Sequence, residues 1–263
     1  MKQKKAILVT SFGTSHLDTM EKTIAAVENA ISSALPQYTL RRAFTSTIIM
    51  KKLRSRDGME IDNVTEALNR LVEEGFEEVV LQPTHILCGE EYEKLCALAS
   101  PFVDKLTISM GTPLLRTIDQ HWALAKAMKD LLPQPGEDEA ILFMGHGTPH
   151  FANAAYALLQ YMLEDLGADH IYVGTVEGCP DLQQVIRRIR RNPGIRKLTL
   201  LPLMVVAGDH ANNDMAGPEP DSWKNILTKE GYQVTCLLKG LGEFPEIRRL
   251  FVDHALEAAG KLH

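Results

Sequence analysis

The chain has 263 residues, enough for two ordinary domains or one large α/β domain, and its 45% hydrophobic and 24% charged residues are typical of a globular protein that folds in water. The formal net charge of −6 argues against binding to nucleic-acid phosphates, and no apolar run approaches the roughly 18 residues of a membrane span. The four cysteines form no C-x-x-C pair, which argues against a thiolate zinc site or a disulfide framework and favours a reducing compartment. The first apolar run is too short for a signal peptide, so we expect a cytoplasmic protein without nucleic-acid or membrane partners.

Strand-like apolar runs alternate with helical patterns along the first half of the chain. The run Lys5–Thr10 leads into the loop SFGTSH, and apolar residues at helical spacing follow from Met20 to Leu35 and again from Val64 to Val72. A polar stretch, PQPGEDE (Pro133–Glu139), is the best candidate for a linker. Further strands are predicted at Tyr38–Phe44, Glu78–Gln82 and Lys105–Met110, with helices around Lys94–Leu98 and Ile118–Leu132.

The same alternation returns after the linker. Strands are predicted at Ala140–Met144, His170–Val176, Lys197–Val206 (the longest) and Tyr232–Leu238, and Pro180 and Pro245 open two of the helices between and after them. We therefore predict an α/β protein of two similar tandem domains, 1–134 and 135–263. Each has a four-stranded parallel sheet flanked by helices and joined by right-handed crossovers.

The two halves also resemble one another in detail. ILVTSFGTSH (Ile7–His16) aligns without gaps with ILFMGHGTPH (Ile141–His150), and VVLQPTHILCGEE aligns with the segment from Thr199 so that Pro83 matches Pro202 and Gly89 matches Gly208. A tandem duplication explains this better than shared α/β turn residues do. It predicts that equivalent loops face each other across a cleft between the domains.

Three polar residues in the second half each follow a predicted strand: His146, Glu177 and His210. Each alone is weak evidence, since a lone histidine is more often structural, but the carboxyl ends of parallel strands converge in space. Two imidazoles with one carboxylate suit a divalent transition metal such as cobalt, iron, nickel or zinc. We therefore predict that His146, Glu177 and His210 hold a metal ion.

Several common enzyme classes are excluded by missing motifs. The sequence has no G-x-G-x-x-G or Walker A motif, so nothing supports dinucleotide or ATP binding, and it has no G-x-S-x-G or H-E-x-x-H. Three weaker candidates remain, each with a plain structural alternative. Backbone N–H groups of SFGT (Ser11, Phe12, Gly13, Thr14) could hold an anion or simply form a turn. Glu91, opposite His210 in the repeat, could approach the cleft or lie in solvent. The basic run Lys51–Gly58 could bind a carboxylate, although such runs usually lie on a solvated face.

The sequence resembles the anaerobic sirohydrochlorin cobaltochelatases of the CbiK type, class II chelatases related to ferrochelatase. The resemblance is carried by LVTSFGTSHLDT, RAFTSTIIMKKLRSRDG, HILCGEEYEK, FMGHGTPH, PLMVVAGDHANNDMAG with DSWK, and GLGE, and it covers nearly the whole chain. It implies a chelatase-like fold with an inter-domain cleft and ATP-independent insertion of Co²⁺ into sirohydrochlorin in cobalamin biosynthesis. The family's metal-binding histidines match His146 and His210, its metal-binding glutamate matches Glu177, and its Gly-Asp/Glu-Glu-Tyr glutamate matches Glu91.

We expect His146, with His210 second, to accept pyrrole protons, because neutral imidazole is a competent base near pH 7. Glu91 is expected to relay protons or orient the macrocycle from the other side. The substrate's carboxylates are expected at the SFGT and HGTP loops, with Arg42 and Lys51 as the weakest candidates. No ATP or other nucleotide is expected.

Fe²⁺ and Ni²⁺ remain alternatives to Co²⁺, because the three ligands suit all of these metals. The alternative functions are a ferrochelatase acting on sirohydrochlorin or a porphyrin, and a non-catalytic protein that holds a tetrapyrrole or a metal. The oligomeric state is left open, with a homo-oligomer as one option.

Overall fold

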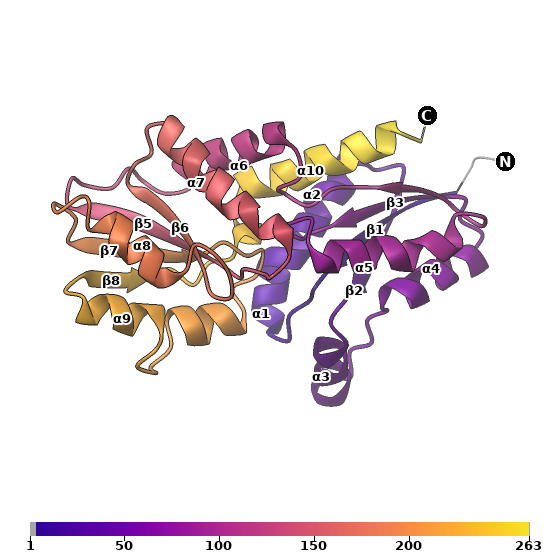
Figure 1. Cartoon of the computed structure of the whole chain (residues 1–263). Helices are drawn as coiled ribbons and strands as arrows, with labels where there is room; N and C mark the ends of the chain where they lie inside the picture. Colours follow the sequence, from indigo (N-terminus) through magenta and orange to yellow (C-terminus); the bar gives the residue numbers. More distant parts are fainter. Residues whose placement is uncertain (1–3, 263) are drawn as a thin grey trace. The chain divides into compact units, whose positions relative to one another are not determined.

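The computed structural model describes residues 4–262. The chain divides into two compact units, the first comprising Met1–Arg116 with Arg248–His263 and the second Thr117–Ile247. Each unit contains one four-stranded parallel sheet with helices packed against it (Figure 1). Over residues 4–262 no helix combines the length and the apolar character needed to cross a bilayer.

The sheet of the first unit has the strand order β2-β1-β3-β4. Residues alternate between its two faces, and side chains on both faces are buried, as expected of a parallel sheet covered on both sides. Ala6 and Leu8 on one face pack against α4 and α5, while Ile7 and Val9 on the other are also fully buried. The bounds are β1 Lys5–Ser11, α1 Leu17–Met20, a π-helical turn at Glu21–Ala25, α2 Ala26–Ala34, β2 Thr39–Phe44, α3 Thr47–Asp57, α4 Val64–Glu73, β3 Glu78–Pro83, α5 Glu90–Ala99, β4 Thr107–Met110 and α10 Pro245–Gly260.

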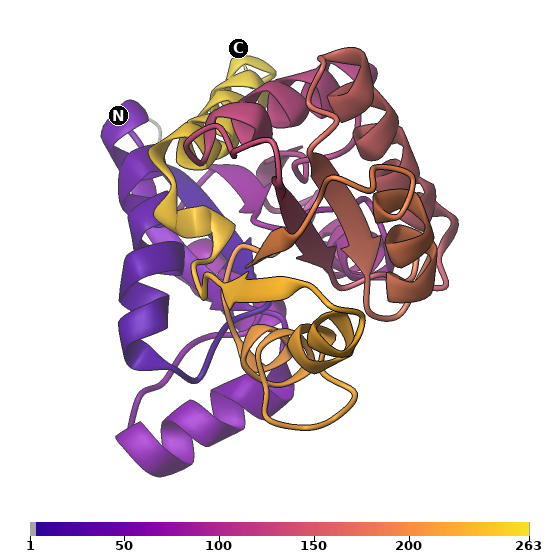
Figure 2. The same ribbon diagram turned by 90° about the vertical axis from the view of Figure 1, so that its left-hand side faces the viewer.

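The second unit repeats this topology with the strand order β6-β5-β7-β8. One face of its sheet, with Leu142, Met144 and Leu200, packs against α8, α9 and the π-helical turn η4. Helix α7 packs on β6 and α6 packs on α7 (Figures 1 and 2). The bounds are α6 Ile118–Asp130, β5 Glu139–Gly145, α7 Ala154–Asp165, β6 Ile171–Thr175, α8 Leu182–Ile189, β7 Lys197–Pro202, η4 Ala211–Met215, α9 Trp223–Lys229 and β8 Gln233–Cys236.

All eight predicted strands are present, and the two identical strand orders confirm the predicted pair of similar α/β halves. The longest predicted strand, Lys197–Val206, is wrong at its end, because β7 stops at Pro202. After Pro202 the chain bends, and the segment near Gly240 takes over as its partner: Leu241 N donates to Met204 O (2.8 Å) and Gly242 N to Val205 O (3.0 Å). His210 therefore lies several residues beyond the strand end.

The compact units divide the chain differently from the predicted halves 1–134 and 135–263. Helix α6 belongs to the second unit, where it packs on α7, and most of α10 belongs to the first. Within the first unit, the His254 ring Nδ1 is 3.2 Å from the Thr112 carbonyl oxygen. The boundaries of the two units depend on which elements each helix packs against, and the composition of the sequence does not reveal this.

Candidate metal site

His146 follows directly on β5, which ends at Gly145. Its Nδ1 lies 2.8 Å from the carbonyl oxygen of Gly147. A carbonyl oxygen can only accept, so in the neutral ring Nδ1 carries the proton and Nε2 keeps its lone pair. The side chain is 47% exposed. His146 therefore presents an available imidazole nitrogen at the carboxyl end of the sheet, where ligands bind in open α/β folds.

His210 precedes the π-helical turn η4. Its Nδ1 lies 2.6 Å from Oδ2 of Asp214, which lies four residues later, inside the turn. A carboxylate accepts this proton, which orients the ring and leaves Nε2 of His210 available to bind a metal. Irregular π-helical turns are frequent at functional sites. Here the turn holds a carboxylate–histidine pair of the kind that orients metal ligands.

The two histidines lie close together in the second unit. Their ring centroids are 4.4 Å apart with an edge-to-face angle of 84°. Glu177 is joined to the same place through the main chain, since its N–H donates to the carbonyl of His146 (2.8 Å). The structure therefore places the three predicted ligands in one cluster.

The side chains of His146, Glu177 and His210 are not arranged to coordinate one metal ion together. Within residues 4–262 no group of three or more His, Cys, Asp or Glu side chains is arranged to hold a metal ion. The Glu177 carboxylate lies 3.8 Å from Nδ1 of His146, the nitrogen that donates to Gly147 O. This side chain is 58% exposed, so other staggered rotamers are open to it.

Gly147 permits the close approach of the segment after β5 to the main chain at Glu177 and Gly178. Its φ is +85°, and a Cβ there would lie 2.6 Å from Gly178 N and 2.9 Å from Glu177 C. We expect Gly147→Ala to lower the free energy of unfolding by about 2–4 kcal/mol, because backbone strain and overpacking add. Gly231→Ala is the matched control: its φ is +96° but nothing lies within 4 Å of a Cβ, so only the strain remains. Urea denaturation of both variants measures the difference, and equal losses would refute the close approach.

Glu91 lies in the first turn of α5 in the first unit, 40% exposed and ion-paired with Lys94 (2.9 Å). Near it is His85, whose two ring nitrogens are buried without a hydrogen-bond partner among residues 4–262. Burial lowers the pKa of His85 to about 4, against the opposing effect of the Glu91 charge. His85 is therefore neutral at physiological pH.

The remaining candidates of the first unit are less available than their sequence suggests. The Ser11 hydroxyl is buried and accepts a hydrogen bond from Thr84 Oγ1 (2.9 Å), whereas Phe12 is 53% exposed. Arg42 is less available to a substrate than the sequence suggests, because its guanidinium is bound by both carboxylate oxygens of Glu28, a buried residue. Burial raises the pKa of Glu28, and its pairing with Arg42 opposes that shift. Arg42 is thus committed to a structural ion pair.

Comparison with known proteins settles the family. The family model for cobalt chelatase (CbiK) matches residues 5–260. The chain belongs to the cobalt chelatase (CbiK) family. A sirohydrochlorin cobaltochelatase of Salmonella typhimurium is 43% identical over 258 residues, covering 97% of this chain and 96% of that protein. A second relative, sirohydrochlorin cobaltochelatase CbiKC of Nitratidesulfovibrio vulgaris, is 32% identical over 263 residues, covering 98% of this chain and 92% of that protein.

Solved structures agree on the fold of this CbiK-family chain. SirB from Bacillus subtilis with Fe³⁺ matches with a TM-score of 0.66 at 16% identity, covering 99% of this chain and 98% of that one. CbiX, described as the terminal enzyme of sirohaem biosynthesis in denitrifying bacteria, matches with a TM-score of 0.53 at 18% identity, over 97% and 99%. At these identities the likeness concerns the fold alone.

Asp214 is the residue of this CbiK-family site that motif analysis missed. The stretch DHANND does contain the signal, a histidine and an aspartate four residues apart. Such spacing is informative only if the segment is helical, and the polar composition of ANND favours a loop. The pairing therefore became visible only with the structure.

Proposed function

We propose that this chain is a sirohydrochlorin cobaltochelatase that inserts Co²⁺ into sirohydrochlorin, without ATP, in the anaerobic route to cobalamin. The observation that carries the proposal is the convergence of His146 and His210, with Nε2 of each available and ring centroids 4.4 Å apart, in a member of the CbiK family. A cytoplasmic location is part of the proposal.

In the metal-binding step, Nε2 of His146 and of His210 and the carboxylate of Glu177 replace part of the water shell of Co²⁺. Two neutral nitrogens and one anionic oxygen suit this borderline metal and leave positions open for the incoming pyrrole nitrogens. Asp214 fixes the ring of His210 from behind. The metal is a substrate and leaves with the product.

In the proton-transfer step, His146 accepts a pyrrole proton on Nε2 as the metal departs, and His210 is second in this role. The Glu177 carboxylate, 3.8 Å from Nδ1 of His146, then stabilises the imidazolium that forms. Ligation and proton acceptance follow one another, because a nitrogen released by the metal becomes free to take a proton.

On the side of the first unit, we assign Glu91 to proton relay or to orienting the macrocycle. Ser11, Phe12, Gly13 and Thr14 line the substrate, with the exposed Phe12 ring against the macrocycle and the main chain towards its carboxylates. Phe12 occupies the place that His146 holds in the second unit. Metal chemistry is therefore assigned to the second unit alone.

The test is the absorbance of sirohydrochlorin with the purified chain and Co²⁺, Fe²⁺ or Ni²⁺ in turn. Catalysed insertion of Co²⁺ well above the uncatalysed rate supports the proposal. A clear preference for Fe²⁺ selects a ferrochelatase. Stoichiometric binding without turnover selects a non-catalytic tetrapyrrole or metal carrier.

Glu177→Ala should weaken cobalt binding more than tetrapyrrole binding. Loss of one anionic ligand worth about 1.4 kcal/mol raises the dissociation constant of Co²⁺ about tenfold, while affinity for metal-free sirohydrochlorin stays within about twofold. Calorimetry with Co²⁺ and absorbance titration with sirohydrochlorin separate the two. Glu219→Ala removes an equal charge from an exposed position of the same unit and should change neither. The reverse pattern for Glu177→Ala would exclude its role as a ligand.

A further inference from the structure

The loop that follows β1 has hydrogen-bond donors without acceptors. The backbone N–H groups of Gly13, Thr14 and Ser15 donate to no group among residues 4–262. Gly13 is half-buried, and Thr14 and Ser15 are 3% and 5% exposed. Backbone N–H groups without an acceptor are uncommon in folded proteins, and three of them in one loop suit a ligand with acceptor oxygens.

The equivalent loop of the second unit has a similar backbone but fewer open donors, because Thr148 N has an acceptor and Pro149, which matches Ser15, has no N–H. Gly13 and Gly147 both have positive φ, and the hydroxyls of Thr14 and Thr148 both accept from the N–H two residues later. In the second unit, however, Thr148 N also donates to Asn153 Oδ1 (3.1 Å). Thr19 stands where the repeat alignment places Asn153, and no such bond is made there. Thr14 N therefore lacks the side-chain acceptor that Thr148 N has in the second unit.

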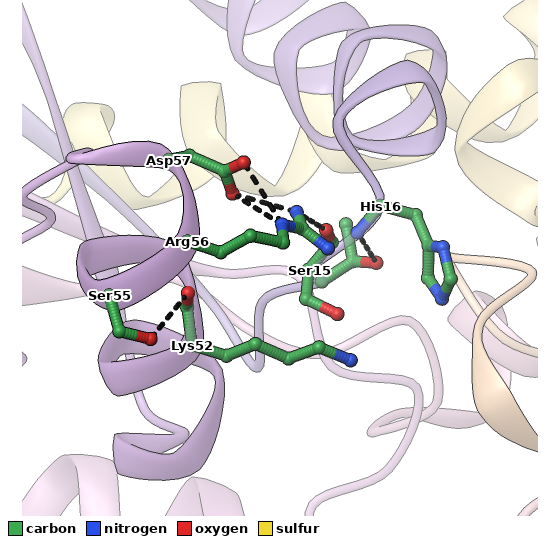
Figure 3. A network of polar contacts seen from close by, with 7 residues as sticks. Ser15, His16, Lys52, Ser55, Arg56 and Asp57 are labelled. Carbon is green, nitrogen blue, oxygen red and sulfur yellow. Dashed lines mark hydrogen bonds and ion pairs between the residues drawn. The ribbon is translucent and has the colours of Figure 1, made fainter.

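Both ends of helix α3 are hydrogen-bonded to the loop Phe12–Ser15, which is called the open loop below. At its start, Ser46 N donates to Phe12 O (3.2 Å). At its end, Arg56 Nη2 donates to the Ser15 carbonyl while its Nε and Nη2 hold the Asp57 carboxylate (Figure 3). Arg56 is thus a structural clamp whose charge is neutralised by Asp57.

Lys52 lies one helical turn before Arg56 on the same side of α3. Its ammonium has no hydrogen-bonding or ionic partner in the part of the chain that the structure describes. Figure 3 shows its side chain extended towards the side of the helix where Ser15 lies. Lys51, by contrast, lines a hollow of about 160 Å³ together with Glu60 and Glu66. Of these two lysines, only Lys52 is thus directed at the open loop.

We propose that Lys52 and the backbone N–H groups of Gly13–Ser15 form a carboxylate-binding cradle for a rim carboxylate of the tetrapyrrole. This deepens the proposed function and rests on it for the nature of the substrate. A carboxylate has the acceptor oxygens that these donors lack, and Lys52 supplies the charge that a neutral loop cannot. Arg56 is a positioning residue, because it holds α3 and the loop together. The HGTP loop, with Thr148 N already bonded, has no equivalent cradle.

The test is the binding of metal-free sirohydrochlorin, followed by absorbance, to the wild type and to Lys52→Met, Lys52→Arg and Lys51→Met. We expect Lys52→Met to raise the dissociation constant about tenfold, Lys52→Arg to restore most of the affinity, and Lys51→Met to change it less than twofold. Raising the salt concentration should narrow the gap between Lys52→Met and the wild type, because salt screens a charge-dependent contact. In turnover, Lys52→Met should raise KM and leave kcat within about twofold.

Other outcomes overturn the proposal in distinct ways. If folded Lys52→Met binds sirohydrochlorin as tightly as the wild type, the cradle is refuted. If Lys52→Met and Lys51→Met lose affinity equally, the lysines act only through the overall positive charge of α3, and a specific contact by Lys52 is refuted. A wild type that binds sirohydrochlorin in a Lys52-dependent manner but inserts no metal keeps the cradle and refutes the proposed reaction. A wild type that does not bind sirohydrochlorin refutes both.

Discussion

Replacing His146 or His210 with alanine is expected to lower the rate of cobalt insertion at least about 100-fold. Each substitution removes one of the two imidazoles whose ring centroids lie 4.4 Å apart, and His146 is also the assigned proton acceptor. General-base catalysis alone typically contributes a factor of about 10² to 10⁴. Initial rates with sirohydrochlorin and Co²⁺ measure the effect.

The two variants should respond differently to a high concentration of Co²⁺. Saturating Co²⁺ should recover part of the activity of His210→Ala, whose main loss is metal affinity, and little of that of His146→Ala. Both side chains are substantially exposed, 47% for His146 and 37% for His210, so urea denaturation should show little change in stability. Near-wild-type activity in both folded variants would exclude the site.

Asp214→Asn is expected to lower cobalt affinity and activity about 10- to 100-fold, although Asp214 is not one of the three proposed metal ligands. The carboxylate lies 2.6 Å from Nδ1 of His210, and loss of such partners typically costs this much in metal sites. Asparagine keeps the shape but loses the charge that makes His210 a stronger ligand. Cobalt titration and steady-state kinetics both report the change.

Asp221→Asn provides the control for Asp214→Asn. It removes the same charge from an exposed position of the same unit and should behave as the wild type. A wild-type cobalt affinity in Asp214→Asn, with the fold intact, would reduce the His210–Asp214 contact to a surface interaction with no part in metal binding.

Local patterns were sufficient for most of the fold. Runs such as Lys5–Thr10 and Ala140–Met144 carry continuous apolar residues because parallel strands are buried on both faces, so composition alone reveals them. The end of β7 escaped prediction because Leu203, Val205 and Ala207 are buried, as strand residues are, but in an irregular segment. That segment is held by Leu241 and Gly242, residues too distant in sequence for any local pattern to include.

The candidate site divides in the same manner. His146 and His210 could be found because each follows a recognisable strand and the repeat marks the equivalent loops. The hydrogen-bond and ion-pair partners of individual side chains could not be found from the sequence. Arg42 looked available to a substrate until its buried partner Glu28 was seen, and nothing in a basic run distinguishes Lys52 from Lys51 or Arg56. Such distinctions depend on which side of a helix meets which loop.

The hydrogen bond from Glu177 N to His146 O positions residue 177 through the main chain, whereas metal binding would depend on its side chain. Main-chain atoms make this contact, and the close approach of the two segments requires glycine at 147 rather than a particular side chain at 177. We therefore expect a change of side chain at 177 to alter metal binding with little loss of folding stability. The matching place in the first unit holds Phe12, a residue without metal affinity, on the same strand order.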